Sequence, residues 1–275
     1  MALSFDTFPM QEIRKGRALC WDPHAIDFSQ DKEDWLNLNP DEQKLLLGQV
    51  FGFLIGERAV AHDLAPLQGA LRRERGHMDE EMYITQQLFE ESTHVEFFQR
   101  WMDEVLPGKL GEDIPYPPGE PSEIIRELLP KYLNALNTDH SPEAQMRAVV
   151  IYHQIVEGVQ AEVGYELFYG AMDPLGILPG LREGVRNIQK DESRHIAFGT
   201  YLAQRIIRDF PQTKDVFIEN MDGLLDVALE GMDRIFKPYT EPYPFGFKTE
   251  TFTQLTRTLH ARRRESVLQG HLVTQ

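Results

Sequence analysis

The sequence predicts an all-α protein in which long helices pack into one bundle. Apolar residues recur at steps of three and four over most of the 275 residues, and no stretch has the pattern of a convincing strand. No low-complexity segment or domain linker divides the chain. Since 41% of the residues are hydrophobic, the chain can bury a large core. We therefore expect residues 1–275 to form a single helical domain.

The first long helix has a clear start signal. Asn39 can cap a helix, Pro40 suits its first position, and Glu42 stands where the acid of a capping box belongs. After an irregular opening segment, we therefore expect a helix over about 40–64. Glu57 lies in this helix among apolar residues, so it is predicted to face the core.

The same signals place the later helices. They are expected at about 79–105, in a short amphipathic stretch ending near 136, and at about 141–169, 181–208, 215–236 and 250–268. The Pro- and Gly-rich stretch 107–121 is predicted to be a surface connection. The run Arg262-Arg263-Arg264 is expected on the solvated face of the last helix.

Composition excludes several classes of function. A net charge of -16 would repel nucleic acid and anionic lipid. The first 25 residues contain no signal-peptide core, and the longest apolar run, near 50–55, is too short to cross a bilayer. The single cysteine, Cys20, cannot form an internal disulfide, which fits a reducing compartment. We expect a cytoplasmic protein without a transmembrane segment.

A Glu-x-x-His pair occurs twice on the predicted helices. Glu91 and His94 form the first pair, and Glu192 and His195 form the second. Residues three apart share a helix face, so each pair can offer a carboxylate and an imidazole to one metal ion. Each pair also follows a helical glutamate at nearly the same interval, which is 34 residues in one half and 35 in the other. The six predicted ligands are Glu57, Glu91, His94, Glu157, Glu192 and His195.

This ligand set matches the dimetal carboxylate bundles. Four glutamates balance two divalent ions, so the site can be neutral inside a dry core. Carboxylates with one imidazole per ion suit iron and manganese and leave positions for dioxygen, whereas structural zinc prefers thiolates. A lone Glu-x-x-His is more often surface decoration, and a lone Glu57 could be a core acid paired with an arginine. The matched spacing of all six favours the metal site.

With these residues in view, the chain resembles the small-subunit superfamily of ribonucleotide reductase, whose fold is a ferritin-like helical bundle. The resemblance covers about residues 20–210 and includes Trp21-Asp22-Pro23, Asp27, Asp31 and the ligand series with Asp191 before Glu192. It implies that Asp191 accepts a hydrogen bond from His94 and that Trp21 lies beyond it.

Two branches of this superfamily compete. A reductase subunit usually has a radical tyrosine one turn after the first-half histidine, where this chain has Phe98, and a tyrosine in its C-terminal tail, whereas this chain has none after Tyr243. The chain is more similar to the reductase-like ligand-binding oxidases, which place a valine three residues after the first glutamate and a tyrosine five before the third. Val60 and Tyr152 occupy those positions.

The oxidase resemblance implies a manganese/iron cofactor, with di-iron as the alternative, that activates dioxygen and joins Val60 to Tyr152 by an ether cross-link. It also implies a long-chain fatty acid or similar hydrophobic ligand in an apolar tunnel. We expect a homodimer. The alternatives are a reductase subunit and, as a non-enzymatic function, a metal-storage cage. Because a spacing of five is off-face in a regular helix, we expect a π-bulge between Tyr152 and Glu157.

Overall fold

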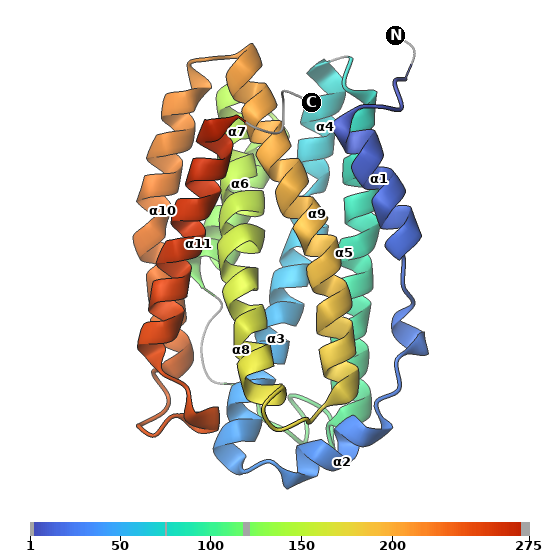
Figure 1. Cartoon of the computed structure of the whole chain (residues 1–275), viewed down its shortest axis with the longest axis vertical. Coiled ribbons are helices and arrows are strands. Elements are labelled where there is room, and N and C mark those ends of the chain that lie inside the picture. Colours follow the sequence, from blue (N-terminus) through green and yellow to red (C-terminus); the bar gives the residue numbers. More distant parts are fainter. Residues whose placement is uncertain (1–2, 75, 118–121, 271–275) are drawn as a thin grey trace.

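Long helices along one axis form the centre of the molecule (Figure 1). The computed structural model describes residues 3–74, 76–117 and 122–270 and is 79% helical, so the all-α prediction is confirmed. In the described part, the β-type contact is an isolated bridge between Leu110 and Ile114, and there is no strand. The central helices are α3 (Pro40–Asp63), α5 (Met78–Val105), α9 (Pro179–Asp209) and the unbroken run of α7 (Pro142–Val149), η3 (Val150–Ala161) and α8 (Glu162–Met172).

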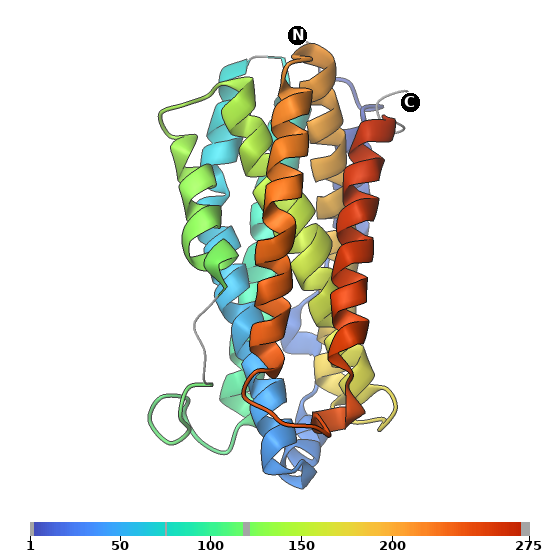
Figure 2. The ribbon, with the colours of Figure 1, turned by 90° about the vertical axis from the view of Figure 1, so that its left-hand side faces the viewer.

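Shorter and peripheral helices surround this centre (Figures 1 and 2). They are α1 (Phe8–Leu19), η1 (Pro23–Ala25), α2 (Ser29–Asn37), α4 (Ala65–Glu74), η2 (Ile124–Leu128), α6 (Leu129–Ala135), α10 (Thr213–Phe236), η4 (Pro244–Gly246) and α11 (Thr249–Gln269). α1 packs on α5 and α9, while α10 and α11 pack on η3. Among the described residues, none of the helices combines the length and the apolar character that crossing a membrane requires.

The expectation of an irregular opening segment was wrong, because α1 and α2 both lie within it. No side chain makes a capping hydrogen bond at the start of either helix. Thr7 at the N-cap position and Pro9 in the first turn did offer a start signal for α1 in the sequence, and it was overlooked. Of the apolar side chains in α1, Pro9, Met10 and Ile13 are buried, and α1 packs against α5 and α9. Tertiary packing therefore stabilises this helix. α4 was also not predicted.

The start of α3 is as predicted. Asn39 Oδ1 accepts hydrogen bonds from the backbone N–H groups of Asp41 and Glu42, both at 3.0 Å. In return, the Glu42 carboxylate accepts from the Asn39 N–H at 3.0 Å, which completes the capping box. The capping box thus defines the N-terminus of the helix that carries Glu57.

The start of α9 is capped from a distant part of the chain. The buried carboxylate of Asp31, on α2, accepts hydrogen bonds from the N–H groups of Gly180 and Leu181, both at 2.8 Å, and from Trp101 Nε1 at 2.9 Å. A carboxylate at a helix N-terminus is stabilised by the unpaired N–H groups there. Asp31 therefore connects α2, α5 and α9 at one end of the bundle.

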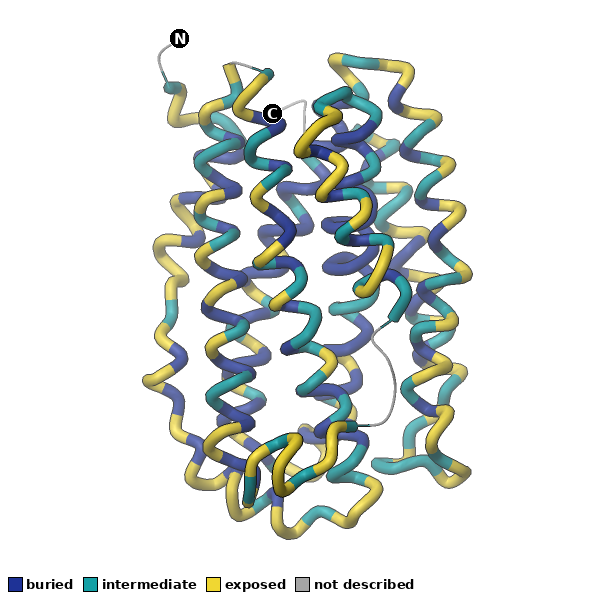
Figure 3. Tube along the Cα trace, turned by 180° about the vertical axis from the view of Figure 1, so that it is seen from behind, coloured by how far each residue is buried: buried dark blue, intermediate teal, exposed yellow. Residues whose placement is uncertain are grey.

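Buried residues recur along the central helices (Figure 3). Their apolar side chains form two groups that fill the interior. Phe97 and Phe98, one turn after His94, belong to one group. Phe198, three residues after His195, belongs to the other. The predicted ligand histidines of α5 and α9 are therefore each followed, one turn later, by buried apolar side chains.

Candidate metal centre

The structure brings all six predicted ligands together. Glu57 comes from α3, Glu91 and His94 from α5, Glu157 from η3, and Glu192 and His195 from α9. Each is at least nine-tenths buried, and the most exposed of them, Glu57, is 6% exposed. So many buried ionisable groups would be unfavourable without compensating charge.

The six side chains form two overlapping sets that share Glu91 and Glu192. One set adds Glu57 and His94, and the other adds Glu157 and His195. Within each set, the possible ligand atoms lie within 4.8 Å of one another. Two neighbouring ions could thus be bridged by the shared carboxylates.

The imidazole nitrogens that face the cluster lie at contact distance from the carboxylates. His94 Nδ1 is 3.4 Å from Glu57 Oε2 and 3.4 Å from Glu192 Oε1. His195 Nδ1 is 3.2 Å from Glu91 Oε1 and 3.4 Å from Glu157 Oε1. Each histidine therefore directs Nδ1 at the centre of its own set.

Several of these buried atoms have no hydrogen-bond partner within the described chain. They are Glu91 Oε2, Glu157 Oε2, Glu192 Oε2, His94 Nδ1 and His195 Nδ1. Buried polar atoms are seldom left unpaired. A pair of metal ions would satisfy all five, so the residues present fit a dimetal centre.

The pKa shifts of the cluster residues also support a dimetal centre. Burial raises the pKa of Glu57 to about 8, and burial together with the charge of Glu192 raises the pKa of Glu157 well above its ordinary value. Burial lowers the pKa values of His94 and His195, but the surrounding carboxylates outweigh it and leave both well above the usual range. Protons thus compensate the acidic cluster where cations are missing.

A second layer of carboxylates holds the far side of each histidine. Asp191 Oδ2 lies 3.3 Å from His94 Nε2 and accepts from Trp21 Nε1 at 2.8 Å. Glu90 Oε2 lies 2.8 Å from His195 Nε2. Each of these acids precedes a ligand glutamate and supports the histidine of the opposite helix. Such partners fix the tautomer and orientation of ligand histidines.

The sequence interpretation missed Glu90 and Arg194. Arg194 Nη2 donates to Glu90 at 2.6 Å and to Asp191 at 2.8 Å, so one guanidinium joins both supporting carboxylates. The signal was available for Glu90, because it precedes Glu91 as Asp191 precedes Glu192. For Arg194, the contact depends on how α5 and α9 pack.

A π-bulge between Tyr152 and Glu157 was predicted from their spacing of five, and the π-helix η3 contains both residues but is longer than predicted, at twelve residues. Arg263, expected on a solvated face, is instead partly buried, and its Nε donates to the Gly158 carbonyl at 3.0 Å. A widened turn leaves carbonyl groups without regular helical partners, so Arg263 satisfies one of them. The bare Cα of Gly199 lets η3 approach α9, since a Cβ there would lie 2.1 Å from the Cβ of His153.

Val60 and Tyr152 both lie near the cluster. Val60 is buried one turn after Glu57 on α3. The Tyr152 hydroxyl donates to Glu91 Oε1 at 2.7 Å and accepts from Gln87 Nε2 at 3.2 Å. Gln87, one turn before Glu91, was not singled out from the sequence.

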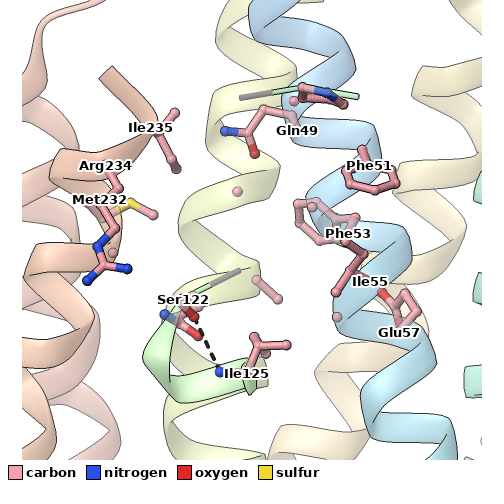
Figure 4. Close-up of a pocket in the computed structure, with 18 of the residues that line it drawn as sticks. Gln49, Phe51, Phe53, Ile55, Glu57, Ser122, Ile125, Met232, Arg234 and Ile235 are labelled. Atoms are coloured by element: carbon pink, nitrogen blue, oxygen red, sulfur yellow. Dashed lines mark hydrogen bonds between the residues drawn. The ribbon is translucent and has the colours of Figure 1, made fainter. Parts of the chain in front are cut away.

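A cavity of about 280 Å³ leads to the cluster. Val60 and the carboxylates Glu57, Glu91, Glu157 and Glu192 belong to its lining, most of which is apolar. Figure 4 shows its walls, formed by α3 with Phe51, Phe53 and Ile55, by the start of η2, and by α10. A hydrophobic molecule could therefore reach the centre with its chain in the apolar part.

Comparisons with known proteins agree with this geometry. The sequence matches the family of the ribonucleotide reductase small chain over residues 9–254. A solved R2-like ligand-binding oxidase with an aerobically reconstituted Mn/Fe cofactor is 31% identical, with a TM-score of 0.86, covering 96% of this chain and 94% of that one. A variant of such an oxidase, also with an aerobically reconstituted Mn/Fe cofactor, is 30% identical, with a TM-score of 0.88 and coverage of 96% and 98%. An anaerobically reconstituted variant is 31% identical, with a TM-score of 0.87.

Proposed function

Since the chain belongs to the ribonucleotide reductase small-chain family, we propose that it is a ligand-binding oxidase that activates dioxygen at a manganese/iron centre. One observation carries the proposal. The buried cluster of four glutamates and two histidines is suited to a dimetal centre, and it opens into a largely apolar cavity rather than directly to solvent. We take residues 1–275 as one domain that acts as a homodimer.

Six residues would hold the metals, with Glu91 and Glu192 shared between the two ions. The donor set of carboxylates and imidazoles suits manganese and iron better than softer metals. The structural relatives with about 30% identity carry Mn/Fe cofactors, and this favours the mixed pair over di-iron here. Asp191 and Glu90 would orient the two histidines from behind.

The proposed ligand is a long-chain fatty acid or a similar amphiphile. The cavity follows α3 from Lys44 to Glu57, which are thirteen residues apart. At a rise of 1.5 Å per residue this is about 20 Å. An extended alkyl chain advances about 1.3 Å per carbon, given bonds of about 1.5 Å. The cavity can thus accept roughly fifteen carbons, with the carboxylate at the metal end.

The proposed oxidation joins Val60 to Tyr152. The Cβ–H bond of Val60 and the O–H bond of Tyr152 break, and a carbon–oxygen bond forms between them. Reduction of dioxygen to two waters takes four electrons and four protons. The two broken bonds supply two electrons and two protons, solvent would supply the other two protons, and a manganese/iron pair, when bound, would supply the other two electrons.

This chain's own residues favour Tyr152 as the oxidised phenol. Its hydroxyl is held 2.7 Å from the Glu91 carboxylate, so its proton has an acceptor. The reductase-subunit alternative is less favoured, because the position one turn after His94 is Phe98, a fully buried side chain with no hydroxyl to oxidise.

The test is an intact mass of protein loaded with manganese and iron and exposed to air. The proposal expects loss of two hydrogen atoms and, after proteolysis, one linked peptide containing Val60 and Tyr152. Tyr152→Phe should abolish both changes while the metals remain bound, because Tyr152 is not a proposed ligand. An unchanged mass in fully loaded wild type would refute the cross-linking oxidase.

A further inference from the structure

Gln87 lies between the metal cluster and the tyrosine. It is fully buried on α5. Its Nε2 donates to Glu157 Oε1 at 2.9 Å and to the Tyr152 hydroxyl oxygen at 3.2 Å. Both hydrogens of the amide are therefore used inside the site.

The direction of this amide is dictated by its neighbours. As a metal ligand Glu157 would be ionised, and an ionised carboxylate only accepts hydrogen bonds, so in the metal-loaded site Glu157 requires the nitrogen of Gln87 on its side, as it lies here at 2.9 Å. The opposite orientation would place the amide oxygen against both the Glu157 carboxylate and the Tyr152 oxygen. The amide nitrogen must therefore face Tyr152 as well.

His153 fixes the other end of the amide. Its Nε2 lies 3.4 Å from Gln87 Oε1, and an amide oxygen only accepts, so the ring carries its hydrogen on Nε2. Burial lowers the pKa of His153 to about 3, which keeps the ring neutral with one N–H. Because that N–H points at the Gln87 oxygen, the amide cannot turn without losing this contact.

The Tyr152 hydroxyl can therefore donate its hydrogen in only one direction. Its oxygen already accepts a hydrogen bond from Gln87, so its O–H group donates to Glu91 Oε1, 2.7 Å away. Among the described residues, the hydroxyls of the other two fully buried tyrosines, Tyr83 and Tyr165, have no hydrogen-bond partner. Tyr83 and Tyr165 therefore have no acceptor for their hydroxyl proton. Oxidation of either one would leave a positive charge in the apolar interior, which is unfavourable.

From this geometry we propose that Gln87 is a positioning residue that directs the Tyr152 hydrogen at Glu91 and so selects Tyr152 for oxidation. The inference rests on the proposed function, since the oxidised metal pair is the electron acceptor. In the step, the Tyr152 proton would pass to the Glu91 carboxylate. The Cβ–H bond of Val60 would break as the carbon–oxygen bond forms, and the Val60 proton and one electron from each residue would be consumed in the reduction of dioxygen to water.

The central test is Gln87→Met, which keeps the side-chain length and removes both N–H groups. We expect wild-type metal content, and formation of the linked peptide roughly tenfold slower than in wild type, in line with the loss of one buried hydrogen bond. His153→Phe leaves Gln87 in place but frees its amide to turn, so a smaller slowing is expected. The matched control is Gln154→Met, since Gln154 is fully buried on η3, the π-helix that carries Tyr152, and its side chain makes no hydrogen bond within the described chain.

A second measurement uses protein loaded with manganese and iron in the absence of oxygen, so that Tyr152 is still unmodified. The C–O stretching band of Tyr152 can be isolated as the infrared difference between each protein and the same protein carrying Tyr152→Phe. This band should shift in Gln87→Met, because the oxygen no longer accepts a hydrogen bond, and should stay in place in Gln154→Met. A merely structural role for Gln87 would not move it.

The two possible failures are distinguishable. Equal cross-linking rates in wild type and Gln87→Met, together with an unmoved band, would overturn the positioning role and leave the oxidase standing. Absence of the linked peptide in loaded wild type would instead overturn the proposed function, and with it the selection of Tyr152.

Discussion

The glycine face of α3 provides a test of the proposed ligand. Gly48, Gly52 and Gly56 are four residues apart, share one face of the helix, and line the cavity. A Cβ built on Gly52 or Gly56 would meet nothing within 4 Å, and one on Gly48 would meet only Pro117, at 3.9 Å. The missing side chains therefore create the space in which the proposed alkyl chain lies.

A leucine at these positions should shorten the ligand by an amount that follows from helix geometry. Gly52 is five residues from Glu57, or about 7.5 Å, and Gly48 is nine residues away, or about 13.5 Å. At about 1.3 Å per carbon, Gly52→Leu should leave room for roughly six carbons and Gly48→Leu for roughly ten. Each methylene excluded from the cavity costs about 0.8 kcal/mol, close to fourfold in affinity.

The assay is denaturation of the purified variants, solvent extraction, and mass spectrometry of the released lipids. Gly223→Leu is the matched control, because a Cβ there also meets nothing within 4 Å and Gly223 does not line the cavity. Replacing glycine by leucine inside a helix favours the helix by roughly 1 kcal/mol, so the variants should fold. An identical distribution of chain lengths in wild type, Gly48→Leu and Gly52→Leu would refute the placement of the ligand along α3.

Three further outcomes are expected. Glu91→Ala and His195→Ala should each lower bound metal, measured by elemental analysis, and lower the Tm of the metal-treated protein; full metal occupancy in both variants would contradict the ligand assignment. In metal-free protein, the raised pKa values of Glu57, about 8, and of His195 mean that the folded state holds protons that the unfolded chain releases. Stability should therefore fall as pH rises from about 4.5 to 8, and a thermal-unfolding series that is flat or rising from pH 6 to 8 would contradict this. Arg263→Met should leave a π-helix carbonyl unpaired and lower stability by about 1–3 kcal/mol, measured by chemical denaturation, whereas a change within error would mean that solvent replaces the guanidinium.

Local patterns in the sequence were sufficient for much of the fold and for the ligand set. The capping box at Asn39 and the apolar periodicity placed α3, because both depend on neighbours within one or two turns. The repeated Glu-x-x-His and the similar intervals to Glu57 and Glu157 identified the cluster, since ligands three apart must share a helix face. The five-residue spacing of Tyr152 and Glu157 likewise predicted the π-helix.

Tertiary structure decided the features that depend on contacts between distant segments. No side chain caps α1, and packing on α5 and α9 stabilises this helix. Arg194 joins Glu90 to Asp191 only because α5 and α9 lie side by side, and Arg263 reaches a carbonyl 105 residues away. The cavity is likewise a space between helices, and no local pattern encodes it. The sequence alone therefore determined which side chains could bind metal, whereas helix packing decided how they are held and what can reach them.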